Sequence, residues 1–428
     1  MCRRRRLACA VTTPTDRPRR APPHPLLAGP LRTLRFRDFR ILWVATMAMS
    51  MGFWMQQLTL GWLVLQISDS AFWVGVAEAA RLAPFLLFGL VAGTLADRLE
   101  RRILLRVIVT VNIILSVILG TLELNGLLTV PIAIAGAFLY GTVNAFLMPT
   151  LQAYVHDIVG SRYVVNGLAL NQFAQRLMGV FGGLMGGVLL AFLGIGGTLL
   201  VMAGGYATAL VILFFTRTAS RPGFGTPEQP SVRQSFGEAL SLAGRNPSVR
   251  ALLLLSVATE IFAFSHTVMI AIFARDVLEI GEQGFGIMVA ARAVGSVVGV
   301  AVLASIGDRL PKGKSLLVAS ALFGLSLAAF GSQPWLVTAL FFLGVAGMMA
   351  SIFDLFQQAA LQLAVGGDQR GRAMGIWVMG VGAGPVGHLE VGSLSDFTSP
   401  QFAIIFNGLM LIVVVILLTM TTPRLRQI

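Results

Sequence analysis

The stretch GTLADRLERR, residues 93–102, joins an apolar segment to five charged side chains within its last six positions. A shorter copy, DRLPKGK, occurs at residues 308–314 and also follows an apolar segment. In both copies an arginine lies 16 residues before the aspartate: Arg81 before Asp97, and Arg292 before Asp308. The same two features at the same spacing predict two parallel repeats of one helical unit.

The composition excludes most soluble proteins. Of the 428 residues, 56% are hydrophobic and 12% are charged, whereas a soluble domain carries about 25% charged residues. Such a chain cannot cover a globule with polar surface, which excludes a soluble enzyme, a disordered scaffold and a nucleic-acid-binding domain. A membrane-spanning helix needs about 20 apolar residues, so twelve of them would take roughly 240. We therefore expect an all-α membrane protein with twelve transmembrane helices.

Apolar runs of spanning length divide the chain into two pseudo-symmetric six-helix bundles. The runs lie at about 41–67, 72–96, 103–122, 128–155, 163–193, 196–216, 251–274, 284–306, 314–332, 335–364, 371–395 and 400–421. The bundles are expected within residues 41–217 and 248–421. Residues 218–247 contain prolines, serines and arginines without helical periodicity, which is typical of a linker. We expect residues 1–40 to form a basic, disordered tail and residues 422–428 a short second tail.

The basic residues predict the orientation in the membrane. With the N-terminus in the cytoplasm, 28 of the 32 lysine and arginine residues lie in cytoplasmic segments, and Arg275 alone lies in an outer loop. Positive residues favour the cytoplasmic side, so both termini and the linker are expected there, near anionic lipid. This topology explains the net charge of +13 without a nucleic-acid partner. Cys2 and Cys9 lie in the first tail and match no metal or redox spacing.

The charged stretch also resembles a known signature. Residues 93–102 are similar to the loop G-x-x-x-D-R-x-G-R-R between the second and third helices of the major facilitator superfamily, with Glu100 where the family usually has glycine. The second copy has Ala304 in place of the leading glycine, and residues 370–375 resemble the stretch that opens the eleventh helix. The motifs WMQQ and LGW within residues 54–62 resemble an exporter subgroup that includes the enterobactin exporter and macrolide efflux proteins.

This resemblance implies a bacterial secondary transporter of the inner membrane, with two bundles around a midplane cavity that opens to each side in turn. It implies proton-driven export of an amphiphilic organic compound, such as a drug or a siderophore-like molecule. The implied partners are this substrate, protons and membrane lipid; no protein partner, cofactor, metal or enzymatic activity is expected. The sequence contains no phosphate-binding G-x-x-x-x-G-K-[ST] motif. The fourth span lacks an arginine and the fifth has glycines at 182–187, so the chain departs from the drug–proton antiporters.

A cytoplasmic gate is the first candidate site. A carboxylate at a helix end followed by arginines can bind neighbouring helix ends while the inner side is closed and release them when it opens. Asp157, at the end of the fourth span, is a candidate partner of Arg101 or Arg98. The predicted gate residues are Gly93, Asp97, Arg98, Arg101, Arg102, Asp157, Asp308 and Arg309. The alternative is a solvated cluster of interfacial charges.

Charges inside the predicted spans mark the second candidate site. Arg176 lies 14 residues beyond Arg162, about 21 Å along the fifth helix and near the middle of the bilayer. Such a charge costs roughly 2.5–3.5 kcal/mol and normally faces a cavity or an opposite charge. Glu260 and Asp354 also fall within spans, and either could neutralise Arg176. The group either binds substrate or protons, with Glu260 preferred over Asp354 as the proton site, or it is a structural ion pair.

Gln56 and Gln57 in the first span complete the predicted substrate or coupling site. Their amides could orient a substrate, and the alternative is hydrogen bonding between helices. Arg81 and Arg292 are excluded from the site, because sixteen residues above a surface aspartate places them about 24 Å up a core of about 30 Å. At that height they can extend to the outer interface, either as anchors there or as part of an outer gate, and Glu78 can pair with Arg81.

Two other functions remain open. An importer of a small organic anion would use Arg176 as the ligand of that anion. A membrane sensor or assembly partner would keep the fold without transport. Such a protein has little reason to retain Arg176, Glu260 and Asp354 together inside the membrane.

Overall fold

The structure, a computed structural model, describes residues 30–219, 237, 241–365, 370–423 and 425. The side chains of residues 30, 89–94, 96, 97, 308 and 370–374 are outside this description. Within the described ranges every regular element is a helix. The predicted all-α fold is therefore confirmed.

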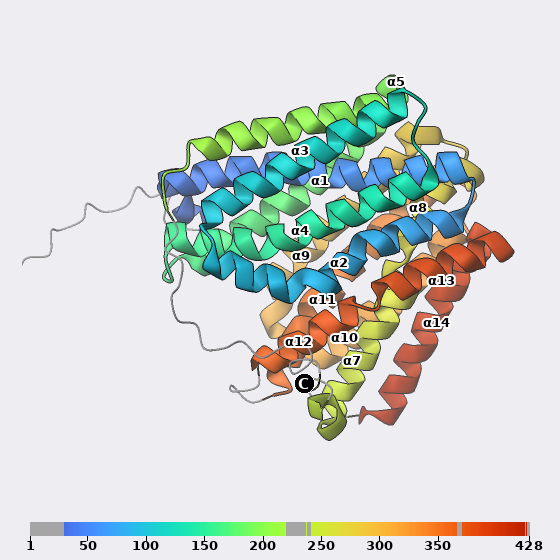
Figure 1. Cartoon of the computed structure of the whole chain (residues 1–428). Helices are drawn as coiled ribbons and strands as arrows, with labels where there is room; N and C mark the ends of the chain where they lie inside the picture. The colour runs from blue at the N-terminus through green and yellow to red at the C-terminus, as the bar shows by residue number, and fades with distance from the viewer. Residues whose placement is uncertain (1–29, 220–236, 238–240, 366–369, 424, 426–428) are drawn as a thin grey trace, which may run out of the picture.

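The first half of the chain forms five long helices, drawn in blue and green in Figure 1. The elements are η2 (Pro30–Arg35), α1 (Arg37–Ser68), α2 (Ala71–Arg98), α3 (Arg101–Leu124), α4 (Val130–Val159) and α5 (Val164–Phe214). α5 contains both the fifth and the sixth predicted spans, because its backbone is non-helical at Gly194, with φ 66° and ψ −172°. Glycine accepts a positive φ at no steric cost, and it separates the two spans here.

The second half forms the remaining spans, drawn in yellow to red. Its elements are α7 (Pro247–Thr259), η3 (Glu260–Phe264), α8 (His266–Ile272), η4 (Phe273–Val277), α9 (Gly281–Ile306), η5 (Gly307–Arg309), α10 (Lys312–Gly331), α11 (Leu336–Leu363), α12 (Arg370–Val381), α13 (Gly384–Phe397) and α14 (Pro400–Thr421). The seventh span is interrupted by two π-helical turns, η3 and η4. The eleventh span is divided into α12 and α13, and Pro385 lies in the first turn of α13.

Twelve spans result, as predicted. Nine segments of the described chain are long and apolar enough to cross a membrane. α1, the part of α5 beyond Gly194 and the pair α12–α13 complete the set. The prediction of a disordered tail does not hold for residues 30–40. There Thr33 donates a hydrogen bond to Asn166 at 3.1 Å, and the Arg35 guanidinium lies 4.2 Å from the ring centre of Tyr163.

The internal repeat extends to the packing of the helices. Gly141 of α4 lies against the carbonyl oxygen of Arg81 in α2, so that a Cβ atom there would collide with backbone. In the second half Gly347 of α11 lies against the carbonyl oxygen of Arg292 in α9 in the same way. Backbone atoms can approach this closely only where a side chain is missing. The two arginines therefore occupy equivalent places in the two halves.

The halves meet through two long helix pairs. α5 packs against α9 and α2 packs against α13, and α8 contacts both α1 and α2; Figure 1 shows α13 alongside α2. Glycines permit a close approach here too. A Cβ atom built on Gly187 of α5 would lie 2.7 Å from the Cα atom of Gly286 in α9. We call this boundary between the halves the seam. Trp62 of α1 and Phe285 of α9 stack across it, with ring centres 5.5 Å apart.

Polar contacts fasten the halves at the predicted outer end, and we call this set the outer latch. Asp396 of α13 accepts hydrogen bonds from the hydroxyl of Ser70 (2.5 Å) and from two backbone N–H groups in the first turn of α2 (2.8 and 3.2 Å). Arg275 of η4 forms an ion pair with Asp69 at 2.7 Å and donates to the carbonyl oxygen of Leu65 at 3.0 Å. The latch thus joins the ends of α1 and α2 to the other half.

Towards the predicted cytoplasmic end, α4 and α11 have their main neighbours within their own halves. The main neighbours of α4 are α1, α2, α3 and α5, all in its own half. Those of α11 are α7, α9, α10 and α12, also in its own half. Among the described residues, the contacts between the halves therefore gather towards the predicted outer end.

Candidate functional site

Arg176 joins the two halves near the middle of the molecule. Its Nη1 atom donates to the hydroxyl oxygens of Ser296 in α9, at 2.7 Å, and Ser351 in α11, at 3.0 Å. The two hydroxyl oxygens are themselves 2.5 Å apart. Among the described side chains, no carboxylate lies within ion-pair distance of Arg176. Hydroxyl groups of the opposite half therefore solvate this charge, and the predicted contact with Glu260 or Asp354 is absent.

Asp354 forms its hydrogen bonds within its own half of the protein. Its Oδ1 atom accepts hydrogen bonds from Gln358 Nε2 and from Trp377 Nε1, both at 3.2 Å. Trp377 belongs to α12, so this carboxylate links the tenth and eleventh spans within the second half.

Glu260 lies where two helices are interrupted. It is the first residue of the π-helical turn η3, and such turns are frequent at functional sites. A Cβ atom built on Gly384, the first residue of α13, would lie 3.4 Å from Glu260 Oε2 and 3.3 Å from Leu82 of α2. In the described part of the chain Glu260 makes no side-chain hydrogen bond or ion pair. Its carboxyl group thus lies near α2 of the opposite half.

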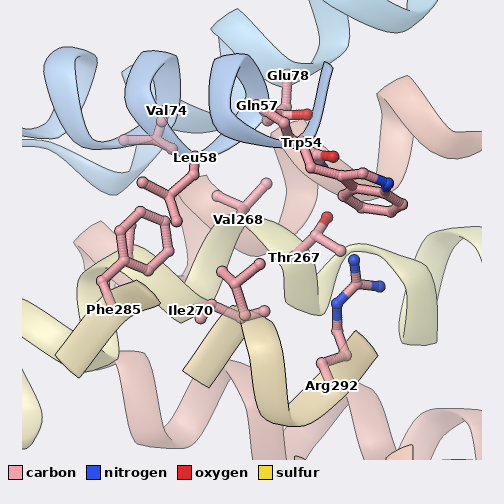
Figure 2. A pocket seen from close by; sticks show the side chains of 13 residues that line it. Trp54, Gln57, Leu58, Val74, Glu78, Thr267, Val268, Ile270, Phe285 and Arg292 are labelled. Atoms are coloured by element: carbon pink, nitrogen blue, oxygen red, sulfur yellow. The ribbon is translucent and has the colours of Figure 1, made fainter. Parts of the chain in front are cut away.

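A small cavity lies between the halves, shown in Figure 2. Its volume is about 30 Å³, room for about two water molecules. One end is polar, with Trp54, Gln57, Glu78, Thr267 and Arg292. The other end is apolar, with Leu58, Val74 and Phe285. The cavity is therefore amphipathic, and its walls come from α1 and α2 on one side and α8 and α9 on the other.

Arg81 does not extend to the outer interface as predicted. It is 8% exposed, and its Nε and Nη2 atoms donate to Glu78 Oε2 at 2.9 and 2.6 Å. Glu78 is itself 5% exposed. The predicted pairing of these two residues occurs, but it occurs in the interior. The prediction of height failed because it took Asp97 as the membrane surface, whereas α2 begins at Ala71 and places Arg81 about 15 Å from its outer end.

Arg292 was excluded by the same reasoning, and the structure places it in the cavity. It lies 11 residues into α9, about 17 Å from the outer end of that helix. Its Nε atom is buried without a hydrogen-bond partner, and its guanidinium lies 5.7 Å from the centre of the Trp54 ring. The signal that could have found it is the repeat itself, because a charge buried in one half has an equivalent in the other.

The two predicted glutamines, Gln56 and Gln57, lie in different surroundings. Gln57 lines the cavity, whereas Gln56 is 1% exposed and accepts a hydrogen bond from the hydroxyl of Tyr206 at 3.3 Å. Tyr206 belongs to the sixth span, so this bond lies within the first half. The placement of Gln56 favours the alternative role of hydrogen bonding between helices.

The predicted gate is described only in part. Arg101 Nη1 lies 2.6 and 2.7 Å from the two carboxylate oxygens of Asp157, so the expected partners are together. Arg102 pairs with Glu100 at 2.8 Å, and Arg98 and Arg309 are exposed. The side chains of Asp97 and Asp308, and the surroundings of Gly93, lie outside the described residues. The Arg101–Asp157 pair links α3 and α4 of one half, and its role in gating stays a prediction.

Comparison with known proteins agrees with this architecture. Residues 28–427 match the family model described as transmembrane secretion effector. The enterobactin exporter EntS of Citrobacter koseri is 25% identical over 72% of the chain and 73% of its own length. The staphyloferrin A transporter of Staphylococcus aureus is 23% identical over 81% of the chain and 86% of its own length.

Solved structures share the fold. A bacterial homolog of the human lysosomal transporter Spinster, in an inward-facing and unoccupied conformation, superposes with a TM-score of 0.68 at 15% identity over 91% of this chain and 96% of its own. The nucleoside transporter NupG gives 0.73 at 13% identity over 90% and 98%. The family match spans nearly the whole chain and the folds agree. The protein therefore belongs to the transmembrane secretion effector family of major facilitator superfamily transporters.

Proposed function

We propose that the protein exports an amphiphilic organic compound across the bacterial inner membrane, driven by the proton gradient. The observation that carries this proposal is a group of ionisable side chains at the seam between two halves that are joined at one end. Arg176 bridges the seam to serines of the other half, and Glu260 and Asp354 lie on its far side. The curated relatives support export, because EntS is named as an exporter of enterobactin.

The way in which the halves are joined supports alternating access. The outer latch and the glycine contacts close the predicted outer end, and the main contacts of α4 and α11 stay within their own halves. This is the arrangement expected when a substrate enters from the cytoplasm. Release to the outside requires the latch to open and the inner ends to close, as a rocking of one half against the other. The gate residues of α2, α3 and α4 would then contact the second half.

Glu260 is the proposed proton site. A coupling carboxylate must gain a proton in one conformation and lose it in the other. Asp354 already accepts two hydrogen bonds on Oδ1, which favour its charged form. Glu260 accepts none among the described residues, and it lies beside Gly384 and close to α2 of the opposite half. Rocking of the halves would change its surroundings directly, as coupling demands.

Export is tested with everted membrane vesicles, whose cytoplasmic face is turned outwards. Vesicles from cells with the protein and from empty-vector cells are offered a panel of lipophilic antibiotics, fluorescent dyes and siderophores, with and without respiration. We expect at least one compound to accumulate only in respiring vesicles that contain the protein. Accumulation equal to the empty vector for the whole panel would contradict export. Uptake of a small organic anion into intact cells would instead favour the importer.

A further inference from the structure

We infer that the cavity between α1, α2, α8 and α9 binds the anionic head of an amphiphilic organic anion, with a carboxylate on Arg292. This inference rests on the proposed function, since it names the class of compound that the protein would carry. It concerns a residue that lies apart from Arg176, Glu260 and Asp354 of the proposed coupling site.

The first argument is the unpaired charge of Arg292. In the described part of the chain its guanidinium donates no hydrogen bond and forms no ion pair, and its Nε atom is buried. A charged side chain at this depth is costly and normally faces a cavity or a partner, and buried donors are nearly always satisfied. Arg292 has five N–H donors in a planar fork that matches a carboxylate. The Trp54 ring, 5.7 Å from the guanidinium, can attract the charge but offers no oxygen acceptor to its N–H groups, so an acceptor for them is best supplied by a ligand.

The second argument is the balance of charge around the cavity. Glu78 is already bound by Arg81 through two hydrogen bonds to one oxygen. Among the described side chains, no ion pair joins Glu78 to Arg292. Two arginines, one from each half, thus remain without a carboxylate in contact. The positive charge at the seam therefore favours an anionic ligand over a neutral or cationic one.

The third argument is the shape of the lining. Figure 2 shows the guanidinium of Arg292 near the ring of Trp54 at one end of the cavity, and Leu58, Val74 and Phe285 at the other. The Trp54 ring is fixed, because its Nε1 atom donates to the carbonyl oxygen of Gln175 at 3.1 Å. A charged head beside Arg292 with an apolar body along the other walls fits this polarity. The present volume of about 30 Å³ admits only the head, so the body enters as the halves separate along this seam.

The test measures binding without any gradient, so its result does not depend on proton coupling. The purified full-length protein in lipid nanodiscs is titrated with decanoate and with decanamide, which has the same chain but no charge, and binding is followed by tryptophan fluorescence. We expect decanoate to bind about tenfold or more tightly than decanamide, because a hydrogen-bonded charge is exchanged for a neutral group. Equal binding of the two compounds by the wild type would overturn the inference.

Variants assign the preference to one side chain. Arg292→Gln should abolish the preference for decanoate, and Arg292→Lys should retain part of it. Arg250→Gln removes the same charge from an exposed position at the start of α7 and should retain all of it. Because an unpaired buried charge is lost, Arg292→Gln should also unfold at a higher temperature than the wild type. A folded Arg292→Gln protein that keeps the full preference would refute the assignment. If that variant does not fold, the wild-type comparison and Arg292→Lys decide.

Discussion

Gln56 and Gln57 are neighbours in α1 with different surroundings, because successive residues of a helix point about 100° apart. Gln56 accepts a hydrogen bond from Tyr206 inside the first half, and Gln57 lines the cavity at the seam. We expect Gln57→Ala to lower transport several-fold at unchanged thermal stability. We expect Gln56→Ala to lower the free energy of unfolding by about 0.5–1 kcal/mol and to leave turnover unchanged.

Both glutamine variants are compared with the wild type for thermal unfolding in detergent and for transport in the same preparations. Each variant thus serves as the matched control of the other. Full transport by Gln57→Ala, or a stable Gln56→Ala protein without transport, would reverse the assignment.

The gate makes a second prediction for single residues. Asp97→Asn should reduce transport several-fold and leave the amount of inserted protein unchanged, because the charge lies at a helix end outside the bilayer core. Asp308→Asn should reduce it less, since the second copy of the motif lacks the leading glycine. Export and membrane abundance are measured on the same cells. Full activity of Asp97→Asn at equal abundance would rule out the gate.

The predictions that failed concern the positions of single side chains. The composition of α1 favours a polar site near residues 56–57, but the direction of each amide depends on the neighbouring helices. Arg292 was placed at the interface because the aspartate of the motif was taken as the membrane surface. Its position 11 residues into α9 and the packing of Gly347 against it, equivalent to that of Gly141 against Arg81, show its depth.

At the scale of the elements, we expect the outer latch to keep the predicted outer ends of the two halves together. Ser70 is the N-cap of α2, and Asp396 of the opposite half adds to the capping by accepting from the N–H groups of Ala71 and Phe72. Loss of a capping side chain costs about 0.5–2 kcal/mol, which corresponds to a roughly two- to thirty-fold change in an equilibrium. Asp396→Ala should therefore shift the protein towards an outward-open conformation.

The shift is measured with a cysteine at Val74, on the apolar side of the cavity, in a protein with Cys2 and Cys9 replaced by serine. An impermeant maleimide should label this cysteine several-fold faster in Asp396→Ala. Glu279→Ala removes an exposed carboxylate from the same end and should leave the rate unchanged. Equal rates in the two variants would show that the latch does not hold this conformation.

The existence of the helices was predictable, but their interruptions were not. Apolar runs of the right length located all twelve spans, because the bilayer dictates length and hydropathy. The π-helical turn at Glu260 and the division between α12 and α13 leave no gap in the apolar pattern. Residues 380–385 read GVGAGP, yet the effect of this stretch on the eleventh span depends on contact with the seventh, where Gly387 lies against the backbone of Ile261.

For the whole molecule, the distribution of arginine and lysine predicts the topology. A cysteine at position 229, in the linker and outside the described residues, should resist an impermeant maleimide added to intact cells. A cysteine at Glu279, in the exposed loop before α9, should react. Lysed cells, in which both positions are accessible, provide the control. Labelling of position 229 from outside would reverse the orientation and, with it, the meaning of the outer latch.

The duplicated architecture could be predicted from two copies of one motif, since equal spacing in both halves requires an equivalent fold. The conformation could not be predicted. Whether the outer or the inner ends are joined depends on contacts such as Asp396 with the start of α2, which combine residues more than 300 positions apart. A transporter must also adopt more than one conformation, so no single sequence pattern encodes which ends of the two halves are in contact.

Proton coupling through Glu260 is tested most directly by flux in proteoliposomes. The compound that accumulates in everted vesicles is measured with and without an imposed pH gradient, for wild type, Glu260→Gln, Asp354→Asn and, as a matched control, Glu279→Gln. We expect the gradient to accelerate flux in the wild type and in Glu279→Gln, and to have no effect on Glu260→Gln although that protein is folded and still exchanges substrate. Asp354→Asn should respond to the gradient. A Glu260→Gln protein that responds as the wild type does would contradict the account.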